Sequence, residues 1–173
     1  LGLSIIVVHG GGPRIKRELE KKKIISKFIN GLRVTDKNII NTVEEVLIDF
    51  NNDIVNSLKK LGSEATSFHT KTKNIIEVEP ERAELGFVGI PNNINVNVIQ
   101  NTLNENKIPI IAPLGVGKNN QTYNINGDTA ASAIAKKLKS RRLILMTNVE
   151  GVYDDQKKLR SEIKPFDLEN LIK

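Results

Sequence analysis

Three consecutive glycines, Gly10, Gly11 and Gly12, form the part of the sequence best suited to bind a ligand. They follow the apolar run at residues 5–8, which is typical of a buried strand, and they precede Pro13, a residue favoured at the first position of a helix. Glycines let backbone N–H groups approach a ligand closely, and a helix start adds positive potential. The stretch therefore predicts an anion-binding loop; a glycine-rich turn with only a structural role is the simpler alternative.

Polar residues also follow other predicted strands. Arg33 stands before a long predicted helix, in a loop where its guanidinium could face a carboxylate. Residues 124–128 follow a short strand, and residues 147–154 follow an apolar one. Because ligands of parallel sheets bind at the carboxyl ends of strands, we expect these stretches to share one edge with the glycine loop. Together these residues could orient carboxylate and phosphate groups, but they include no evident nucleophile. This combination favours phosphoryl transfer, in which catalysis is mostly positioning and charge neutralisation.

The composition argues against several other kinds of site. The 173 residues include no cysteine and only two histidines, without the spacing of a zinc site. The Walker pattern and the Rossmann glycine pattern are both absent. His9 ends the first predicted strand, and we expect it to make a structural hydrogen bond and not to act in acid–base chemistry. Basic residues cluster at predicted helix ends and aromatic residues make up only 4%, which argues against a nucleic-acid surface.

The two ends of the sequence suggest an incomplete protein. The chain starts with leucine, enters a strand almost at once, and stops in D-L-E-N-L-I-K, which has the character of a helix start. We expect that segments are missing at both ends. No apolar run approaches membrane-spanning length and no signal peptide is visible, so a cytoplasmic location is expected.

Strands and helices alternate along the sequence. Helical periodicity predicts helices over residues 14–23, 36–61, 93–105 and 128–139. Short apolar runs predict strands over residues 5–8, 65–68, 74–78, 108–114, 122–126 and 143–146, and a strand or hairpin over 84–89. Thr35 or Asp36 is expected to cap the long helix, and Asn30 with Gly31 predicts a turn. The alternation favours an α/β fold, a three-layer α-β-α sandwich around a central, mostly parallel sheet.

Six motifs occur in one order along nearly the whole chain. They are H-G-G-G-P at residues 9–13, N-G-L-R-V-T-D at 30–36, L-G-F-V-G at 85–89, I-A-P-L-G-V at 111–116, Q-T-Y-N-I-N-G-D-T-A-A at 121–131 and T-N-V-E-G-V-Y-D at 147–154. Together they resemble the N-acetylglutamate kinases of the amino-acid kinase family. Carbamate and uridylate kinases share the glycine loops but not the pair N-G-L-R-V-T and Y-N-x-N-x-D, which makes the resemblance specific.

The resemblance implies ATP-dependent phosphorylation of the γ-carboxylate of N-acetyl-L-glutamate, the second step of arginine biosynthesis, with Mg²⁺ bridging the phosphates of ATP and no metal held by protein ligands. Arg33 would face the α-carboxylate, and Asp128 would orient two catalytic lysines, although a plain helix cap is the structural alternative for Asp128. The substrate-binding residues implied are Gly10, Gly11, Arg33, Asn124 and Asn126. The residues implied for ATP are Asn148, Val149, Glu150, Gly151, Val152 and Tyr153.

Three departures from the family pattern stand out. Gly127 replaces the usual alanine, a change that we expect to be tolerated, and Asn148 replaces a common aspartate, although related kinases also use asparagine there. The two catalytic lysines belong to the motifs K-x-G-G and G-M-x-x-K, which do not occur in residues 1–173. We therefore expect the chain by itself to be inactive. Residues 1–141 would form the N-acetylglutamate-binding lobe without its first strand and helix, and residues 142–173 the start of the ATP-binding lobe.

Two other functions stay open at the level of sequence. A kinase for N-acetyl-aminoadipate would use the same motifs, because the motifs do not show whether the substrate pocket is long enough for one more methylene group. A non-catalytic binding or regulatory module of the same fold would keep the loops without transferring phosphate. The expected partners are N-acetyl-L-glutamate and ATP, with a homo-oligomer for the complete protein and neither nucleic acid nor membrane.

Overall fold

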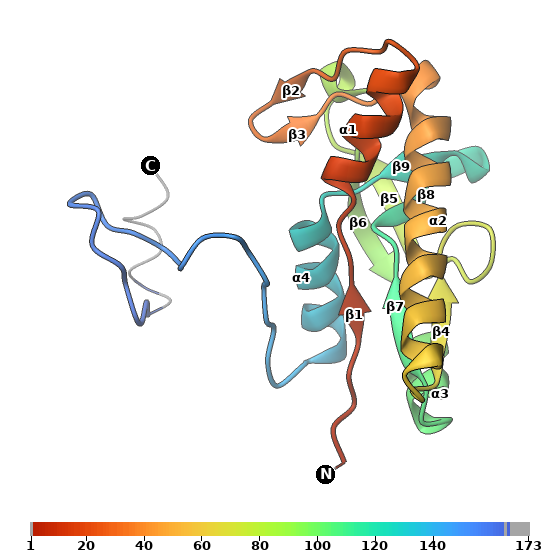
Figure 1. The fold of residues 1–173 in the computed structure, drawn as a ribbon, viewed down its shortest axis with the longest axis vertical. Helices are drawn as coiled ribbons and strands as arrows, with labels where there is room; N and C mark the ends of the chain where they lie inside the picture. Colours follow the sequence, from red (N-terminus) through yellow and green to blue (C-terminus); the bar gives the residue numbers. More distant parts are fainter. Residues whose placement is uncertain (1, 165, 167–173) are drawn as a thin grey trace. The chain divides into compact units, whose positions relative to one another are not determined.

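The computed structural model describes residues 2–164 and 166. The chain divides into two units, residues 1–143 and residues 144–173. The helices and strands of the described part belong to the first unit (Figure 1): β1 (Val7–Val8), α1 (Gly12–Lys21), β2 (Phe28–Ile29), β3 (Leu32–Arg33), α2 (Lys37–Lys60), β4 (Ala65–Phe68), β5 (Ile76–Pro80), the 3₁₀ turn η1 (Ala83–Leu85), β6 (Gly89–Ile94), α3 (Val96–Asn104), β7 (Ile108–Ile111), β8 (Leu114–Val116), the 3₁₀ turn η2 (Lys118–Asn120), β9 (Thr122–Asn124) and α4 (Gly127–Leu138). None of these helices combines the length and the apolar character that a membrane span requires.

Two small sheets lie in the middle of the first unit. β1, β7 and β4 form a three-stranded sheet in that order, and all of its pairs are parallel. The second sheet has the order β6-β5-β8-β9, in which β5 and β8 are parallel and the outer pairs are antiparallel. β7 leads into β8 across Ala112 and Pro113, so the chain passes directly from one sheet to the other. β2 and β3 form a separate antiparallel hairpin.

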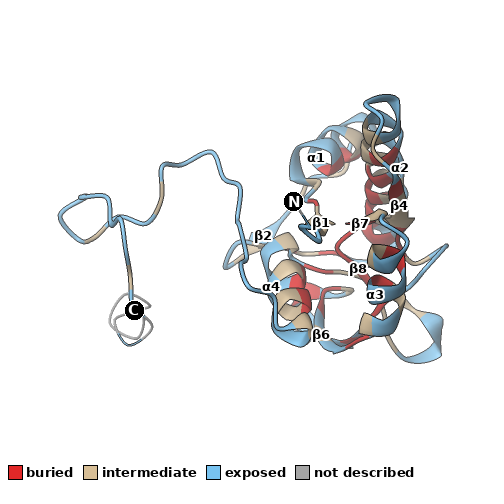
Figure 2. Ribbon diagram, turned by 90° about the horizontal axis from the view of Figure 1, so that it is seen from below, coloured by how far each residue is buried: buried red, intermediate tan, exposed pale blue. Residues whose placement is uncertain are grey.

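Helices cover both faces of the parallel sheet (Figure 2). α1 and α2 pack on one face, and α3 and α4 pack on the other. The side chains of β7 supply both contacts because successive residues of a strand point to opposite faces. Ile110 packs with Val55 of α2, whereas its neighbour Ile111 packs in the cluster that contains Ile134 of α4. This arrangement confirms the predicted α-β-α sandwich.

Local sequence signals place several boundaries correctly. The carboxylate of Asp36 accepts hydrogen bonds from the backbone N–H groups of Asn38 (2.8 Å) and Ile39 (3.0 Å), so Asp36 is the N-cap of α2. Asn30 and Gly31 have φ angles of 49° and 78°, as the two central residues of a type I′ turn require. These positions were predictable because each depends on residues only a few places away.

The first strand is shorter and less buried than predicted. β1 comprises Val7 and Val8, both half-buried, while Ile5 is 51% exposed. In the described part of the chain β1 pairs only with β7, so it is an edge strand with one side uncovered. The β-branched run predicts a strand but carries no information about where in the sheet that strand lies.

The predictions for residues 84–114 are wrong in three details. The predicted strand or hairpin at 84–89 is η1 followed by an extended connection, and a true strand, β6, begins only at Gly89. The predicted helix at 93–105 therefore starts later, at Val96. β6 contains Pro91, which is tolerated because β6 lies at the edge of its sheet. The predicted strand at 108–114 is divided into β7 and β8 where the chain changes sheets.

Residues 143–146 do not form the predicted buried strand. Their side chains are exposed, Met146 by 96%. They take part in no backbone ladder with the described residues. In the described part of the second unit, Tyr153 and Leu159 form an isolated bridge. A strand needs a neighbouring strand for its N–H and C=O groups, so an apolar run alone does not determine one.

Candidate functional site

The glycine loop follows β1 and lies beside the first turns of two helices. α1 begins at Gly12, and α4 begins at Gly127. A Cβ atom built on Gly127 would lie 3.8 Å from the Cα atom of Gly10 and 3.8 Å from the carbonyl oxygen of His9, so the start of α4 touches the loop. The N-terminal ends of both helices therefore add positive potential beside the loop, which suits an anion.

The backbone of the loop is open to a ligand. The N–H groups of Gly10 and Gly11 donate to no acceptor among the described residues. A Cβ atom on Gly10 or Gly12 would meet nothing within 4 Å, so packing does not explain these two glycines. Gly11 has a packing role as well, because its Cβ would lie 2.5 Å from Cδ2 of Leu47. The loop thus offers unpaired N–H donors and free space, as the sequence predicts for an anion site.

Arg33 is a buried cation that has no carboxylate partner in the described part of the chain. It lies in β3, and not in a loop as predicted, with an exposed fraction of 8%. Its guanidinium donates to the hydroxyl of Ser26 and, at 3.4 Å, to the carbonyl oxygen of Gly12 in the glycine loop, and its Cζ atom lies 4.7 Å from the ring centre of Phe28. Burial lowers the pKa of the Arg33 guanidinium. A carboxylate ligand would supply the counter-charge that these partners do not.

The L-G-F-V-G motif connects the strand of Arg33 to the strand of Asn124. The N–H of Phe87 donates to the carbonyl oxygen of Thr35 (2.7 Å), and the N–H of Asn124 donates to the carbonyl oxygen of Phe87 (2.9 Å). The side-chain amide of Asn124 also lies 3.5 Å from the hydroxyl of Thr35, which is fully buried. The motif therefore sets the spacing between two predicted substrate-binding residues, a role that its sequence did not reveal.

Replacing Gly86 by alanine should destabilise this connection. Gly86 has a φ of 70°, and its Cβ would lie 2.5 Å from the carbonyl oxygen of Thr35. We expect the free energy of unfolding, measured by urea denaturation, to fall by about 3 kcal/mol, the sum of left-handed strain and displaced backbone. Gly62→Ala is the matched control, because Gly62 has a φ of 81° but nothing within 4 Å of its Cβ, so only about 1 kcal/mol should be lost. Equal losses of unfolding free energy in the two variants would show that the close contact between position 86 and the carbonyl oxygen of Thr35 does not affect stability.

Asn126, and not Asp128, caps α4. The Oδ1 atom of Asn126 accepts hydrogen bonds from the N–H groups of Asp128 and Thr129, both at 3.0 Å. Asp128 is exposed, and its carboxylate takes part in none of the ion pairs of the described residues. The helix-cap alternative for Asp128 is therefore wrong, and its carboxylate is available to orient a cation.

The residues expected to contact ATP lie in the second unit. Asn148, Val149 and Glu150 are exposed, and the hydroxyl of Tyr153 donates to the carboxylate of Glu150 at 3.1 Å. Gly151 has a φ of 154°. These contacts lie within the second unit, and the assignment of its residues to ATP stays a prediction.

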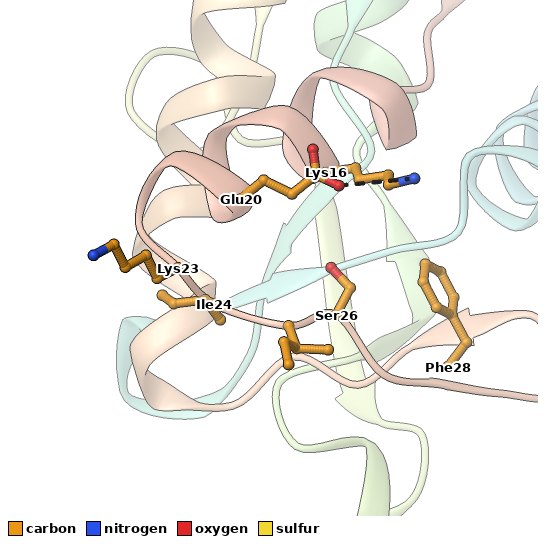
Figure 3. A pocket seen from close by; sticks show the side chains of 7 residues that line it. Lys16, Glu20, Lys23, Ile24, Ser26 and Phe28 are labelled. Carbon is orange, nitrogen blue, oxygen red and sulfur yellow. Dashed lines mark ion pairs between the residues drawn. The ribbon is translucent and has the colours of Figure 1, made fainter.

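A hollow of about 510 Å³ lies beside α1 and the segment that leads to β2 (Figure 3). It contains an ion pair between Lys16 and Glu20 at 3.8 Å. Two of its lining residues contact Arg33: the hydroxyl of Ser26 accepts a hydrogen bond from the guanidinium, and the ring of Phe28 lies beneath it. The hollow therefore borders the site on the side of Arg33. Its lining residues are Lys16, Glu20, Lys23, Ile24, Ile25, Ser26 and Phe28.

His9 is buried directly behind the glycine loop. Its exposed fraction is 7%, and its ring meets the ring of Phe50 edge-on, with centroids 5.1 Å apart. Nδ1 lies 2.8 Å from the carbonyl oxygen of Gly10, and Nε2 lies 3.1 Å from Nδ2 of Asn51. Burial lowers the pKa of His9, which favours the neutral ring. The structure thus gives His9 the structural hydrogen bond that was predicted.

Both histidines should make the folded state less stable in acid. Burial lowers the pKa of His9 and of His69, so the folded chain binds protons less readily than the unfolded chain, in which a histidine has a pKa of about 6.5. Their contribution to stability is complete above that pH and is lost as the pH falls through the lower folded-state values. We expect urea denaturation to give a smaller free energy of unfolding at pH 5.5 than at pH 7.5. The difference should shrink in the His9→Asn, His69→Asn double variant; an unchanged difference would contradict the assignment.

Known proteins resemble this chain along its whole length. The sequence profile described as the amino acid kinase family matches residues 1–173. A protein of Pelagibacter ubique named acetylglutamate kinase is 51% identical over 172 residues, which cover 99% of this chain and 60% of that protein. A protein of Ruegeria pomeroyi with the same name is 40% identical over 173 residues, with the same two coverages. The chain therefore spans about 60% of the length of these relatives.

Solved structures agree with the fold. The crystal structure of smu.665 from Streptococcus mutans UA159 matches with a TM-score of 0.84 and 35% identity, over 89% of this chain and 64% of that one. N-acetylglutamate synthase from Neisseria gonorrhoeae, complexed with coenzyme A and L-arginine, matches with a TM-score of 0.77 over 98% of this chain and 42% of that one. At 17% identity the second match concerns the fold alone.

Proposed function

Because the chain belongs to the amino acid kinase family, we propose that it is part of an acetylglutamate kinase, which phosphorylates the γ-carboxylate of N-acetyl-L-glutamate with ATP in the second step of arginine biosynthesis. The observation that carries the proposal is the buried guanidinium of Arg33 beside the glycine loop, without a carboxylate partner in the described part of the chain. A dicarboxylate fits this site, because one carboxylate can pair with Arg33 while another group accepts from the loop.

In this proposal five residues of the first unit bind the amino acid. Arg33 pairs with the α-carboxylate, and the N–H groups of Gly10 and Gly11 donate to the anion at the loop. Asn124 is held at the site through Thr35 and Phe87. Asn126 uses its Oδ1 atom to cap α4, so its Nδ2 group is the one left to donate to the substrate.

Asp128 is proposed to act on cations and not on the substrate itself. Its exposed carboxylate at the start of α4 would orient the two lysines that this family uses, whose motifs do not occur in residues 1–173. The lysines would neutralise charge on the transferred phosphoryl group, where it develops in the transition state. Asp128 thus supplies alignment, and the chemistry depends on groups outside this sequence.

ATP would supply the phosphoryl group and lie against residues 148–153. The described residues contain no group of three or more histidine, aspartate or glutamate side chains that could hold a metal ion. Following the family resemblance, we place Mg²⁺ on the phosphates of ATP. Residues 1–141 would form the amino-acid-binding lobe and residues 142–173 the start of the nucleotide-binding lobe; the division of the chain between residues 143 and 144 supports this assignment. A cytoplasmic homo-oligomer is proposed for the complete protein.

Steady-state kinetics of the full-length protein tests the function. We expect ADP release that depends on N-acetyl-L-glutamate, with kcat/KM at least about tenfold lower for N-acetyl-aminoadipate, since one methylene in a pocket changes this ratio by 10- to 200-fold. A higher kcat/KM for N-acetyl-aminoadipate would show that this longer acid, and not N-acetyl-L-glutamate, is the preferred substrate. If neither acid is phosphorylated, the chain belongs to a non-catalytic module and the proposed activity is wrong.

A further inference from the structure

A chain of hydrogen-bonded polar groups, most of them buried, lies behind the glycine loop and joins the end of β1 to α2, β7 and β4. The hydroxyl of Ser67 donates to Oδ1 of Asn51, a residue of α2 that is fully buried. Nδ2 of Asn51 lies 2.9 Å from the carbonyl oxygen of Ile110 and 3.1 Å from Nε2 of His9. Every link spans at least 16 residues of sequence, so the chain of contacts exists only in the folded protein.

This network selects one tautomer of His9. The carbonyl oxygen of Ile110 only accepts hydrogen bonds, so the amide nitrogen of Asn51 must face it. The same NH₂ group directs its second hydrogen to Nε2 of His9, which is therefore unprotonated. The ring hydrogen lies on Nδ1, and Nδ1 donates to the carbonyl oxygen of Gly10 at 2.8 Å.

The bond from His9 orients the peptide between Gly10 and Gly11. The chain has no cis peptide bond in its described part, so the N–H of Gly11 points opposite to the carbonyl of Gly10. With that carbonyl turned towards the buried ring, the N–H points away from it and has no acceptor among the described residues. A peptide flanked by glycines rotates easily unless such a bond holds it, because no Cβ restricts either side.

We propose that His9 is a positioning residue, which directs the N–H of Gly11 at the anion bound by the loop. His9 does not touch the substrate; it acts through Gly11, and Asn51 holds it in the tautomer that this requires. The inference rests on the proposed function, in which the anion belongs to N-acetyl-L-glutamate.

Two substitutions separate the two contacts of the His9 ring. In His9→Asn the side-chain amide lies at the position of Nδ1 and can still donate to Gly10. In His9→Gln the amide lies one bond further out, and its Oε1 atom at the position of Nε2 can still accept from Nδ2 of Asn51, whereas the donor to Gly10 is lost. Calorimetry on the full-length protein should give a dissociation constant for N-acetyl-L-glutamate within about threefold of wild type for His9→Asn, and at least about tenfold weaker for His9→Gln, the scale of one hydrogen bond to a charged group.

His69 provides the matched control. It is buried to a similar extent, 6% exposed, and its Nδ1 accepts a hydrogen bond from the N–H of Lys71. His69→Asn and His69→Gln should leave the dissociation constant within about threefold of wild type, since this histidine does not contact the loop. Urea midpoints are measured for all four variants. Equal affinities of the two His9 variants, or affinities that follow their urea midpoints, would overturn the inference.

The tautomer gives a readout that does not depend on the proposed function. ¹⁵N NMR of the histidine rings in the ligand-free wild-type protein should show hydrogen on Nδ1 of His9; hydrogen on Nε2 alone would overturn the inference. If the tautomer is as expected but N-acetyl-L-glutamate does not bind, the proposed function is wrong. The variants are then compared with inorganic phosphate as the anion: weaker binding to His9→Gln than to His9→Asn supports the positioning role, and equal or absent binding refutes it.

Discussion

Replacing Arg33 by alanine is expected to raise the KM for N-acetyl-L-glutamate about a hundredfold, because removing one partner of a buried, hydrogen-bonded charge pair costs 2–5 kcal/mol. The guanidinium is 8% exposed and already held by Ser26 and Gly12, so it is oriented before the substrate arrives. The KM for ATP should change by less than about threefold, since the lost contact concerns the other substrate. Steady-state kinetics of the full-length enzyme, with each substrate varied in turn, measures both values.

Two further variants define the role of Arg33. Arg33→Lys keeps the charge but loses the fork that binds both oxygens of a carboxylate, so an intermediate rise in KM of about tenfold is expected. Arg14→Ala is the control, because Arg14 is an exposed arginine of α1 that pairs with Asp53 at 2.6 Å and contacts no predicted substrate residue. A raised KM for ATP with an unchanged KM for N-acetyl-L-glutamate would assign Arg33 to the nucleotide and contradict the proposed site.

The second large effect is expected for Asp128→Asn, which should lower kcat by a factor on the order of a hundred to a thousand. A carboxylate that aligns two ammonium groups affects charge in the transition state, so the KM values should change little. The substitution removes the charge of Asp128 and keeps its size. Because Asn126 caps α4, the helix start is expected to survive the change. Single-turnover kinetics of the full-length enzyme isolates the chemical step.

Asp36→Asn is the matched control for this variant. Asp36 is also a carboxylate at a helix start, and asparagine caps a helix as well as aspartate does, so stability and kcat should both be retained. If Asp128→Asn keeps full kcat as Asp36→Asn does, Asp128 is an ordinary surface residue and the proposed alignment of lysines is wrong.

The sequence predicted the parts of the site that depend on residue type and close neighbours. The glycine loop between a strand and a helix, the turn at Asn30 and Gly31, and the cap at Asp36 all occur where they were expected. Glycine conformations, turns and helix caps depend on residues within three or four positions of one another, so the local sequence is sufficient to predict them. The order of the motifs suggested the family, and the amino acid kinase profile, which matches residues 1–173, confirms membership of that family.

Prediction from the sequence failed where the structure of a segment depends on contacts with residues far away in the chain. The β-branched run at residues 5–8 did not reveal that β1 is an edge strand. The apolar run at 143–146 predicted a buried strand, but these residues are exposed and pair with no neighbouring strand among the described residues. The L-G-F-V-G motif is recognisable in the sequence, but its role is not. Only the structure shows that the backbone of Phe87 is hydrogen-bonded to both Thr35 and Asn124. An apolar pattern measures a tendency to be buried and does not name the element that covers it.

What the sequence by itself determined is therefore the chemistry available: a glycine loop, a guanidinium, two asparagines and a carboxylate, on an α/β fold. Only the tertiary structure decided that Arg33 is buried without a carboxylate partner among the described residues, that Asn126 and not Asp128 caps α4, and that Asn51, 42 positions from His9, fixes its ring. The physical reason is that burial and hydrogen-bond partners are properties of groups brought together by packing, and these groups are far apart in the chain until it folds.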